Sequence, residues 1–168
     1  MDDDFVGRHL LLDFTVSSPR NIIHIEPIYD FMEEMSCRLD MTLIHPPIVA
    51  KLPFANSELQ RFVKTLKDNG VVSDSVVQME QLLHARANKE SGVSGISMWL
   101  ESHCSIHTWP EKSFVSLDAY SCHDFDITIA LDLVKEMFDV EEGRGLDVVR
   151  HIHSPQKTTQ IIMSTIDS

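Results

Sequence analysis

The chain has 168 residues, of which 43% are hydrophobic and 24% charged, proportions that are ordinary for one soluble domain with a single core. Its net charge of −12 argues against a nucleic-acid partner, because phosphate binding requires clustered lysines and arginines. The same charge suits a cationic ligand, although solubility alone explains it equally simply. The acidic start is unlike a signal peptide, and no apolar run approaches the ~20 residues of a membrane span. Three cysteines, an odd number, favour free thiols in the reducing cytoplasm over disulfides.

Hydrophobic periodicity predicts a mixture of strands and helices in the first half of the chain. Residues 8–16 alternate in polarity as a half-buried strand does, and residues 25–39 carry an apolar stripe at helical spacing. A short strand is expected at 41–44. Two further helices are predicted, one over 57–69 and a shorter one that begins with Asp74 as its cap.

The second half is richer in strands. A polar loop leads into it, and a Pro-Glu-Lys turn separates two of its strands. Asp126 is placed to cap the clearest helix of the chain. The expected elements are a loop at 85–92, strands at 95–100, 105–109, 113–122 and 145–152, a helix at 126–138, and a tail at 153–168.

These elements indicate the fold class. Strands follow one another between residues 95 and 122 with no helix between them, which favours antiparallel pairing. We therefore expect an α/β (α+β) two-layer sandwich, in which helices cover one face of an antiparallel sheet. Residues 1–152 are expected to form a single domain, followed by the tail.

Residues 101–111, ESHCSIHTWPE, concentrate reactive side chains in one short stretch. A zinc site is disfavoured, because His103 and His107 on an extended strand lie about 13 Å apart at ~3.3 Å per residue. A serine hydrolase built from Ser102, His107 and Asp118 lacks the G-x-S-x-G elbow. From the residues alone, a strand-turn-strand with incidental polar side chains remains the simplest interpretation.

The wider pattern around this stretch resembles the processing and active-site region of prokaryotic S-adenosylmethionine decarboxylases. The resemblance covers residues 91–152 well and residues 7–48 weakly. Its elements are GVSG at 92–95, ESH at 101–103, IHTWPE at 106–111, a cysteine twenty residues after Ser102, and GRHLLLDF at 7–14.

The resemblance implies a self-cleaving lyase that carries a pyruvoyl group. Members of this family cut themselves at a Glu-Ser bond, here Glu101-Ser102, and convert the serine into a covalent pyruvoyl cofactor. That group forms a Schiff base with the amine of the substrate and accepts the electrons released with CO₂. The implied product is decarboxylated S-adenosylmethionine for spermidine and other polyamine biosynthesis. The implied assembly is a homodimer with its active sites at the subunit interface, and no metal is implied.

The resemblance also assigns roles to individual residues. Ser102 becomes the pyruvoyl precursor, and Glu101 is the residue on the other side of the cut. His107 is the implied base that removes the Cα proton of Ser102, since imidazole titrates near neutrality. The remaining assignments are Ser94 for processing, Cys122 as the proton donor to the substrate, and Glu111 and Trp109 for substrate binding.

Three departures from the family pattern leave the substrate open. Asn88 stands where the family has a phenylalanine that stacks on adenine, and Phe54 is the candidate replacement ring. Residues 49–90 read as an inserted or replaced segment, and His123 stands where a glycine commonly follows the cysteine. The alternatives are therefore a pyruvoyl arginine or ornithine decarboxylase on the same fold, or a non-catalytic paralogue.

Overall fold

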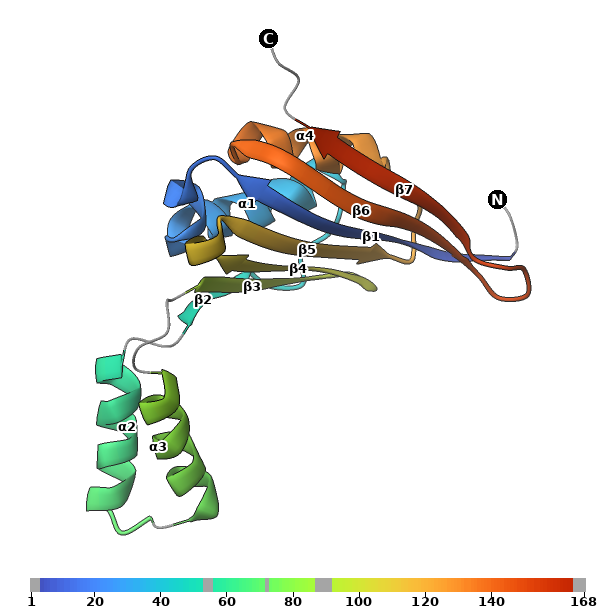
Figure 1. Cartoon of the computed structure of the whole chain (residues 1–168). Helices are drawn as coiled ribbons and strands as arrows, with labels where there is room; N and C mark the ends of the chain where they lie inside the picture. Colours follow the sequence, from blue (N-terminus) through green and yellow to red (C-terminus); the bar gives the residue numbers. More distant parts are fainter. Residues whose placement is uncertain (1–3, 53–55, 72, 87–91, 165–168) are drawn as a thin grey trace.

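The computed structural model describes residues 4–52, 56–71, 73–86 and 92–164. Within these residues, seven strands form one antiparallel sheet in the order β2-β3-β4-β5-β1-β6-β7. Two long helices, α1 and α4, lie on the same face of the sheet (Figure 1). The strands are β1 (Phe5–Val16), β2 (Ile48–Leu52), β3 (Gly92–Trp99), β4 (Ser102–Trp109), β5 (Phe114–Ser121), β6 (Val140–His151) and β7 (Lys157–Ser164). The helices are α1 (Ile25–Arg38), α2 (Asn56–Asp68), α3 (Asp74–Arg86), α4 (Ile127–Met137) and the 3₁₀ turns η1 (Pro19–Ile22) and η2 (Pro110–Lys112).

The core lies between the sheet and its two helices. Alternate residues of β1, β4 and β5 point toward the helices and are almost completely buried, as the period-two pattern predicts. The apolar stripe of α1 supplies the other side of this core. Its main side chains are Leu10, Leu12, Phe14, Ile106, Leu117, Ile28, Phe31, Met32, Leu133 and Val134. The predicted two-layer α+β sandwich is therefore confirmed.

Two polar contacts fix elements that border the candidate site. The Asp126 carboxylate accepts a hydrogen bond from the backbone N–H of Thr128 at 2.9 Å, which confirms the predicted cap of α4. Inside the core, the Thr108 hydroxyl accepts from the N–H of Val93 and donates to the carbonyl of Ile22, both at 2.8 Å. This buried hydroxyl ties β4 to β3 and to η1, and so holds the C-terminal half of β4 in place.

Helices α2 and α3 form a hairpin that lies beyond the β2 edge of the sheet (Figure 1). Val63 and Val76 are buried against each other with Leu66 and Met79, and Lys67 pairs with Glu80 across the hairpin. Both predicted helices are confirmed. β2 precedes the hairpin and β3 follows it. These two strands pair with each other up to Leu52 and Gly92, where the hairpin begins and ends.

Several predicted boundaries were wrong. Residues 41–44 form only an isolated bridge between Leu43 and Trp99, whereas the strand in this region is β2, which the sequence pattern missed. β2 is only five residues long, and none of residues 48–51 is fully buried, so its periodicity is weak. Strands β3, β4 and β6 begin three to five residues earlier than expected. Part of the expected tail forms the edge strand β7, whose polar sequence reflects its exposure.

Candidate active site

The Glu101-Ser102 bond lies at the tip of the β3–β4 hairpin. Trp99 pairs with Ser102 across the strands, so Leu100 and Glu101 are the two residues of the connecting turn. Glu101 has φ of 60°, in the left-handed region that a residue with a Cβ rarely adopts. Such a conformation costs roughly 1–3 kcal/mol. The predicted cleavage bond therefore directly follows a strained residue.

Ser102 is held from the neighbouring strand β5. The Ser102 hydroxyl donates a hydrogen bond to the Ser121 hydroxyl at 3.2 Å. It also accepts a longer hydrogen bond of 3.4 Å from the backbone N–H of Cys122. Ser121 is completely buried and also accepts from the N–H of His123 at 3.0 Å. The register of β4 and β5 places Ser102 directly opposite Ser121, which explains how residues so distant in sequence meet.

The predicted proton donor lies beside this bond. The Cys122 thiol donates to a carboxylate oxygen of Glu101 at 3.4 Å, and its sulfur is 3.2 Å from Nδ1 of His123. Burial, followed by the Glu101 carboxylate, raises the pKa of the Cys122 thiol. The thiol is therefore protonated at neutral pH, which is the form a proton donor requires. We call Glu101, Ser102, Ser121, Cys122 and His123 the cleavage group.

The other predicted residues form a second group near the opposite ends of the same strands. The Ser94 hydroxyl on β3 lies 2.9 Å from Nδ1 of His107 on β4. The Trp109 ring lies tilted beside that of His107, with the ring centroids 6.3 Å apart, and the Phe114 ring lies 5.5 Å from that of Trp109. Glu111 is exposed on η2, which follows Trp109 directly. We call Ser94, His107, Trp109 and Glu111 the histidine group.

Within one chain these two groups do not meet. Ser102 and His107 are five residues apart on a regular strand, a separation of about 16 Å at ~3.3 Å per residue. Because five is an odd number, their side chains also point to opposite faces of the sheet. The burial pattern agrees, since Ser102 is buried on the helix side and His107 is exposed on the other. A proton transfer between them would require a distance of about 3 Å.

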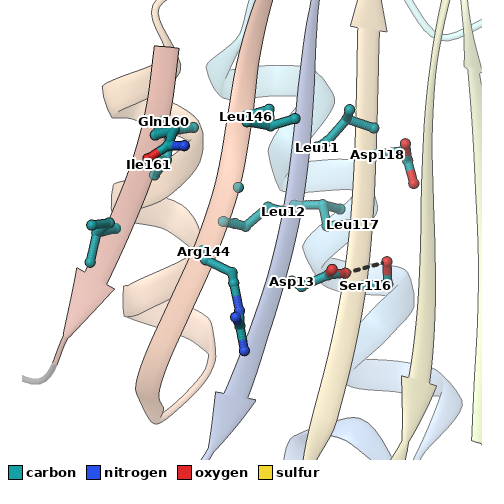
Figure 2. Close-up of a pocket in the computed structure, with 12 residues that line it drawn as sticks. Leu11, Leu12, Asp13, Ser116, Leu117, Asp118, Arg144, Leu146, Gln160 and Ile161 are labelled. Carbon is teal, nitrogen blue, oxygen red and sulfur yellow. Dashed lines mark hydrogen bonds between the residues drawn. The ribbon is translucent and has the colours of Figure 1, made fainter. Parts of the chain in front are cut away.

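The face that carries His107 has no helix over it in the described part of the chain (Figure 1). A hollow of about 600 Å³ lies on this face. Its lining residues include Leu11, Leu146, Asp13, Asp118 and Arg144, which are labelled in Figure 2. The hollow lies one strand away from His107, which pairs with Ser116 at its edge. Large apolar side chains are also exposed on this face, namely Ile48, Ile96, Met98, Leu146 and Ile162.

Two members of the cleavage group, Ser121 and His123, were not predicted as site residues. Ser121 directly precedes Cys122 in the sequence, and the strand register was the information needed to place it opposite Ser102. His123 was noted only as a departure from the family pattern. Asn88 and Phe54, the two positions considered for an adenine-stacking ring, lie outside the described residues.

The described residues contain no group of three side chains that could hold a metal ion. No helix among them is both long and apolar enough to cross a membrane. The three cysteines of the chain, Cys37, Cys104 and Cys122, are all free thiols.

Comparison with known proteins first defines the fold. The structure is similar to the crystal structure of the adenosylmethionine decarboxylase from Aquifex aeolicus VF5, with a TM-score of 0.59 and 18% sequence identity. The similarity covers 93% of this chain and 99% of that one. The α+β sandwich is therefore the fold of an adenosylmethionine decarboxylase.

The sequence comparison then identifies the family. Residues 57–151 match the S-adenosylmethionine decarboxylase family, so this chain belongs to it. The S-adenosylmethionine decarboxylase proenzyme of Pyrococcus horikoshii is 38% identical over 68 residues, which is 40% of this chain and 49% of that protein. The proenzyme of Geobacillus kaustophilus is 36% identical over 87 residues, 52% of this chain and 68% of that protein. The chain thus spans about half to two thirds of the length of these relatives.

Proposed function

We propose that this protein is a self-processing, pyruvoyl-dependent S-adenosylmethionine decarboxylase that cuts its own chain between Glu101 and Ser102. One observation carries the proposal. A serine, a strained glutamate before it, and a protonated cysteine from the next strand converge on one peptide bond at the tip of a hairpin. The related proenzymes of Pyrococcus and Geobacillus are named for the same reaction.

The cleavage chemistry starts from the Ser102 hydroxyl, which attacks the carbonyl carbon of Glu101 and moves the acyl group from nitrogen to oxygen. The left-handed conformation of Glu101 raises the energy of the uncut turn, so that cutting the bond releases strain. Ser121 holds the attacking hydroxyl by a 3.2 Å hydrogen bond from the opposite strand. Elimination then removes the Cα proton of Ser102, with His107 as the proposed base, and breaks the Cβ–O bond so that Glu101 leaves as a carboxylate. Hydrolysis of the resulting dehydroalanine would release ammonia and leave the pyruvoyl group.

The residues around Ser102 fit the pyruvoyl group that this cleavage would leave there. The group supplies an electron sink for the carbanion that forms when CO₂ leaves the substrate. Cys122 lies within hydrogen-bond range of Ser102 through its backbone N–H, so its thiol is close enough to deliver a proton to that carbanion. Its raised pKa keeps the proton available at neutral pH.

Two copies of the chain are needed to complete the site. The cleavage group and the histidine group are separated along β4, and His107 points to the uncovered face of the sheet. In the proposed homodimer, the uncovered faces of the two sheets pack against each other. The two-fold axis lies between the sheets and runs perpendicular to the strands, so that each strand end of one copy lies over the opposite strand end of the other. His107 and Ser94 of one copy then approach the cleavage bond of the other, and the apolar side chains of this face become buried.

The histidine group also supports the substrate assignment. Glu111 presents an exposed carboxylate suited to the ribose hydroxyls of S-adenosylmethionine, and Trp109 presents a flat apolar ring beside His107. Arginine and ornithine offer neither a ribose nor an aromatic base for these residues to recognise. The net charge of −12 suits any of these cationic substrates and does not discriminate between them. We place the enzyme in the cytoplasm, where the free thiols of Cys122 and Cys37 stay reduced.

The test uses the purified full chain on a denaturing gel and in intact-mass spectrometry. We expect two fragments, residues 1–101 and 102–168, with the second blocked to N-terminal sequencing. The Ser102→Ala variant is the control and should remain in one piece. An uncut chain with an unmodified Ser102 would contradict the proposal and favour the non-catalytic paralogue.

The substrate is decided by measuring CO₂ release from carboxyl-labelled S-adenosylmethionine, arginine and ornithine in parallel. We expect release from S-adenosylmethionine alone, and none from any of the three with Ser102→Ala. Release from arginine or ornithine by a correctly cut chain would retain the pyruvoyl chemistry and overturn the substrate assignment.

A further inference from the structure

His123 contacts the sulfur of the proposed proton donor and stands where the family commonly has glycine. Its Nδ1 lies 3.2 Å from the Cys122 sulfur, and the residue is exposed to solvent. The backbone holds this contact in place, because the His123 N–H donates to Ser121 at 3.0 Å and the Cys122 N–H contacts Ser102 at 3.4 Å. The Ser121-Cys122-His123 segment is thus anchored to the serine at the cleavage bond.

The hydrogens of this group can be assigned from what each atom is able to donate. A thiol has one proton, and an ionised carboxylate only accepts, so the Cys122 proton belongs to the contact with Glu101. The sulfur can then only accept from His123, which requires the Nδ1–H form of the imidazole. Among the described residues Glu101 and His123 are the titratable groups in contact with the sulfur, while the adjacent Asp124 is paired with Arg8 at 2.8 Å.

We propose that His123 is the proton relay of this site, which orients the Cys122 thiol and returns a proton to it after each turnover. The inference rests on the proposed function. In each cycle the thiol S–H bond breaks as a C–H bond forms at the carbon that lost CO₂. The thiolate then takes the Nδ1 proton of His123, while Nε2 takes a proton from water. Exchange with water returns the ring to its Nδ1–H form, and the net change is one solvent proton moved to carbon.

A relay through an exposed ring matters because the thiol itself is only partly exposed, and the second copy and the substrate would cover it further. A cysteine left as thiolate after one turnover cannot protonate the next carbanion. Water would then supply the proton to the carbon of the pyruvoyl group instead, and hydrolysis of the imine would leave an N-terminal alanine and release the rest of the substrate as an aldehyde, which would end catalysis. His123 is therefore expected to increase the number of turnovers that each site completes before it is inactivated.

Two variants separate orientation from proton relay. His123→Gly removes both functions. His123→Asn places an amide N–H near the former Nδ1 position, so the hydrogen bond to the sulfur is retained but no proton can pass through the side chain. The 121–123 segment contacts Ser102 through the Ser121 hydroxyl and through backbone N–H groups, and both variants keep these, so each variant should still be cut into the two fragments.

The first readout is the pH dependence of Cys122 alkylation by iodoacetamide, followed on its own peptide by mass spectrometry so that the exposed Cys37 does not interfere. This measurement needs neither cleavage nor turnover. Loss of an N–H donor to the thiolate should raise the alkylation midpoint by about one pH unit in His123→Gly, and much less in His123→Asn. An unchanged midpoint in His123→Gly would overturn the proposed control of the sulfur.

The second readout is the number of turnovers with S-adenosylmethionine before activity is lost, together with the appearance of N-terminal alanine on the 102–168 fragment. General acid–base groups contribute roughly 10²–10⁴-fold, and for this indirect role we expect at least a ~10-fold loss in both variants. Added imidazole should restore His123→Gly. Wild-type turnover numbers in His123→Asn would overturn the relay. If the wild-type chain is uncut or releases no CO₂, the proposed function fails, and the alkylation midpoint alone decides whether His123 controls the thiol.

Discussion

The separation of Ser102 from His107 leads to a quantitative prediction about mixed dimers. The two side chains are about 16 Å apart along β4 and point to opposite faces, whereas a base must come within about 3 Å of the proton it removes. We therefore expect that Ser102→Ala and His107→Ala are each uncut when expressed alone. Coexpressed in equal amounts, about half of the dimers are mixed, and each mixed dimer has one complete site.

The complete site pairs Ser102 of the His107→Ala chain with His107 of the Ser102→Ala chain. About half of the His107→Ala chains should therefore be cut in the coexpressed sample, measured by intact-mass spectrometry. The matched control places both substitutions in one chain and coexpresses it with the wild type. Sites shared between copies then leave about half of the wild-type chains uncut, whereas sites within one chain leave them all cut. Full cutting of the wild type in this control, or no cutting in the first mixture, would refute the shared site.

Three further predictions concern the scaffold. Thr108→Val should lower the free energy of unfolding by about 1–3 kcal/mol, measured by urea titration, because it leaves the Val93 N–H and the Ile22 carbonyl without their hydrogen-bond partner. The control Thr108→Ser keeps the hydroxyl and should lower it less. Replacing 53–91 by a two-residue Asn-Gly turn should preserve the sheet and its cooperative thermal unfolding, because Leu52 and Gly92 already face each other, while the helical circular dichroism signal falls only by the share of α2 and α3; loss of the cooperative transition would show that the helical hairpin is needed for folding. Burial raises the pKa of Cys104 to about 12, so its thiol should resist alkylation in the folded chain at pH 9. The unfolded chain loses this proton at lower pH than the folded chain does. The contribution of Cys104 to the free energy of unfolding should therefore fall as pH rises above the ordinary thiol pKa. Rapid alkylation of Cys104 at pH 9 without unfolding would contradict this last expectation.

Elements with a strong hydrophobic period could be predicted from the sequence, and elements without one could not. The apolar stripe of α1 and the alternation in β1 correspond to buried faces, because burial is what selects those side chains. Among the strands that the structure describes, β2 and β7 are the two at the edges of the sheet, and each pairs along one side. β7 in particular exposes most of its side chains, so polar residues are tolerated and the period is lost. Their position at the edges is a property of the whole sheet, which no local pattern encodes.

In the candidate site as well, the local sequence pattern did not show which side chains lie close together. The family resemblance singled out Ser102, Cys122 and His107 as expected site residues, and the structure brings the first two together through the register of β4 and β5. His107 was grouped with them although its spacing from Ser102 is odd, and on a strand an odd spacing means opposite faces. The sequence therefore already contained the reason why one chain cannot close this site. What it lacked was the assignment of residues 102–109 to a single uninterrupted strand, since the expected strand began only at Ser105. Once β4 is known to be continuous, the odd spacing places His107 on the face opposite to Ser102 of its own chain, and the proposed mechanism therefore assigns it to Ser102 of the other copy.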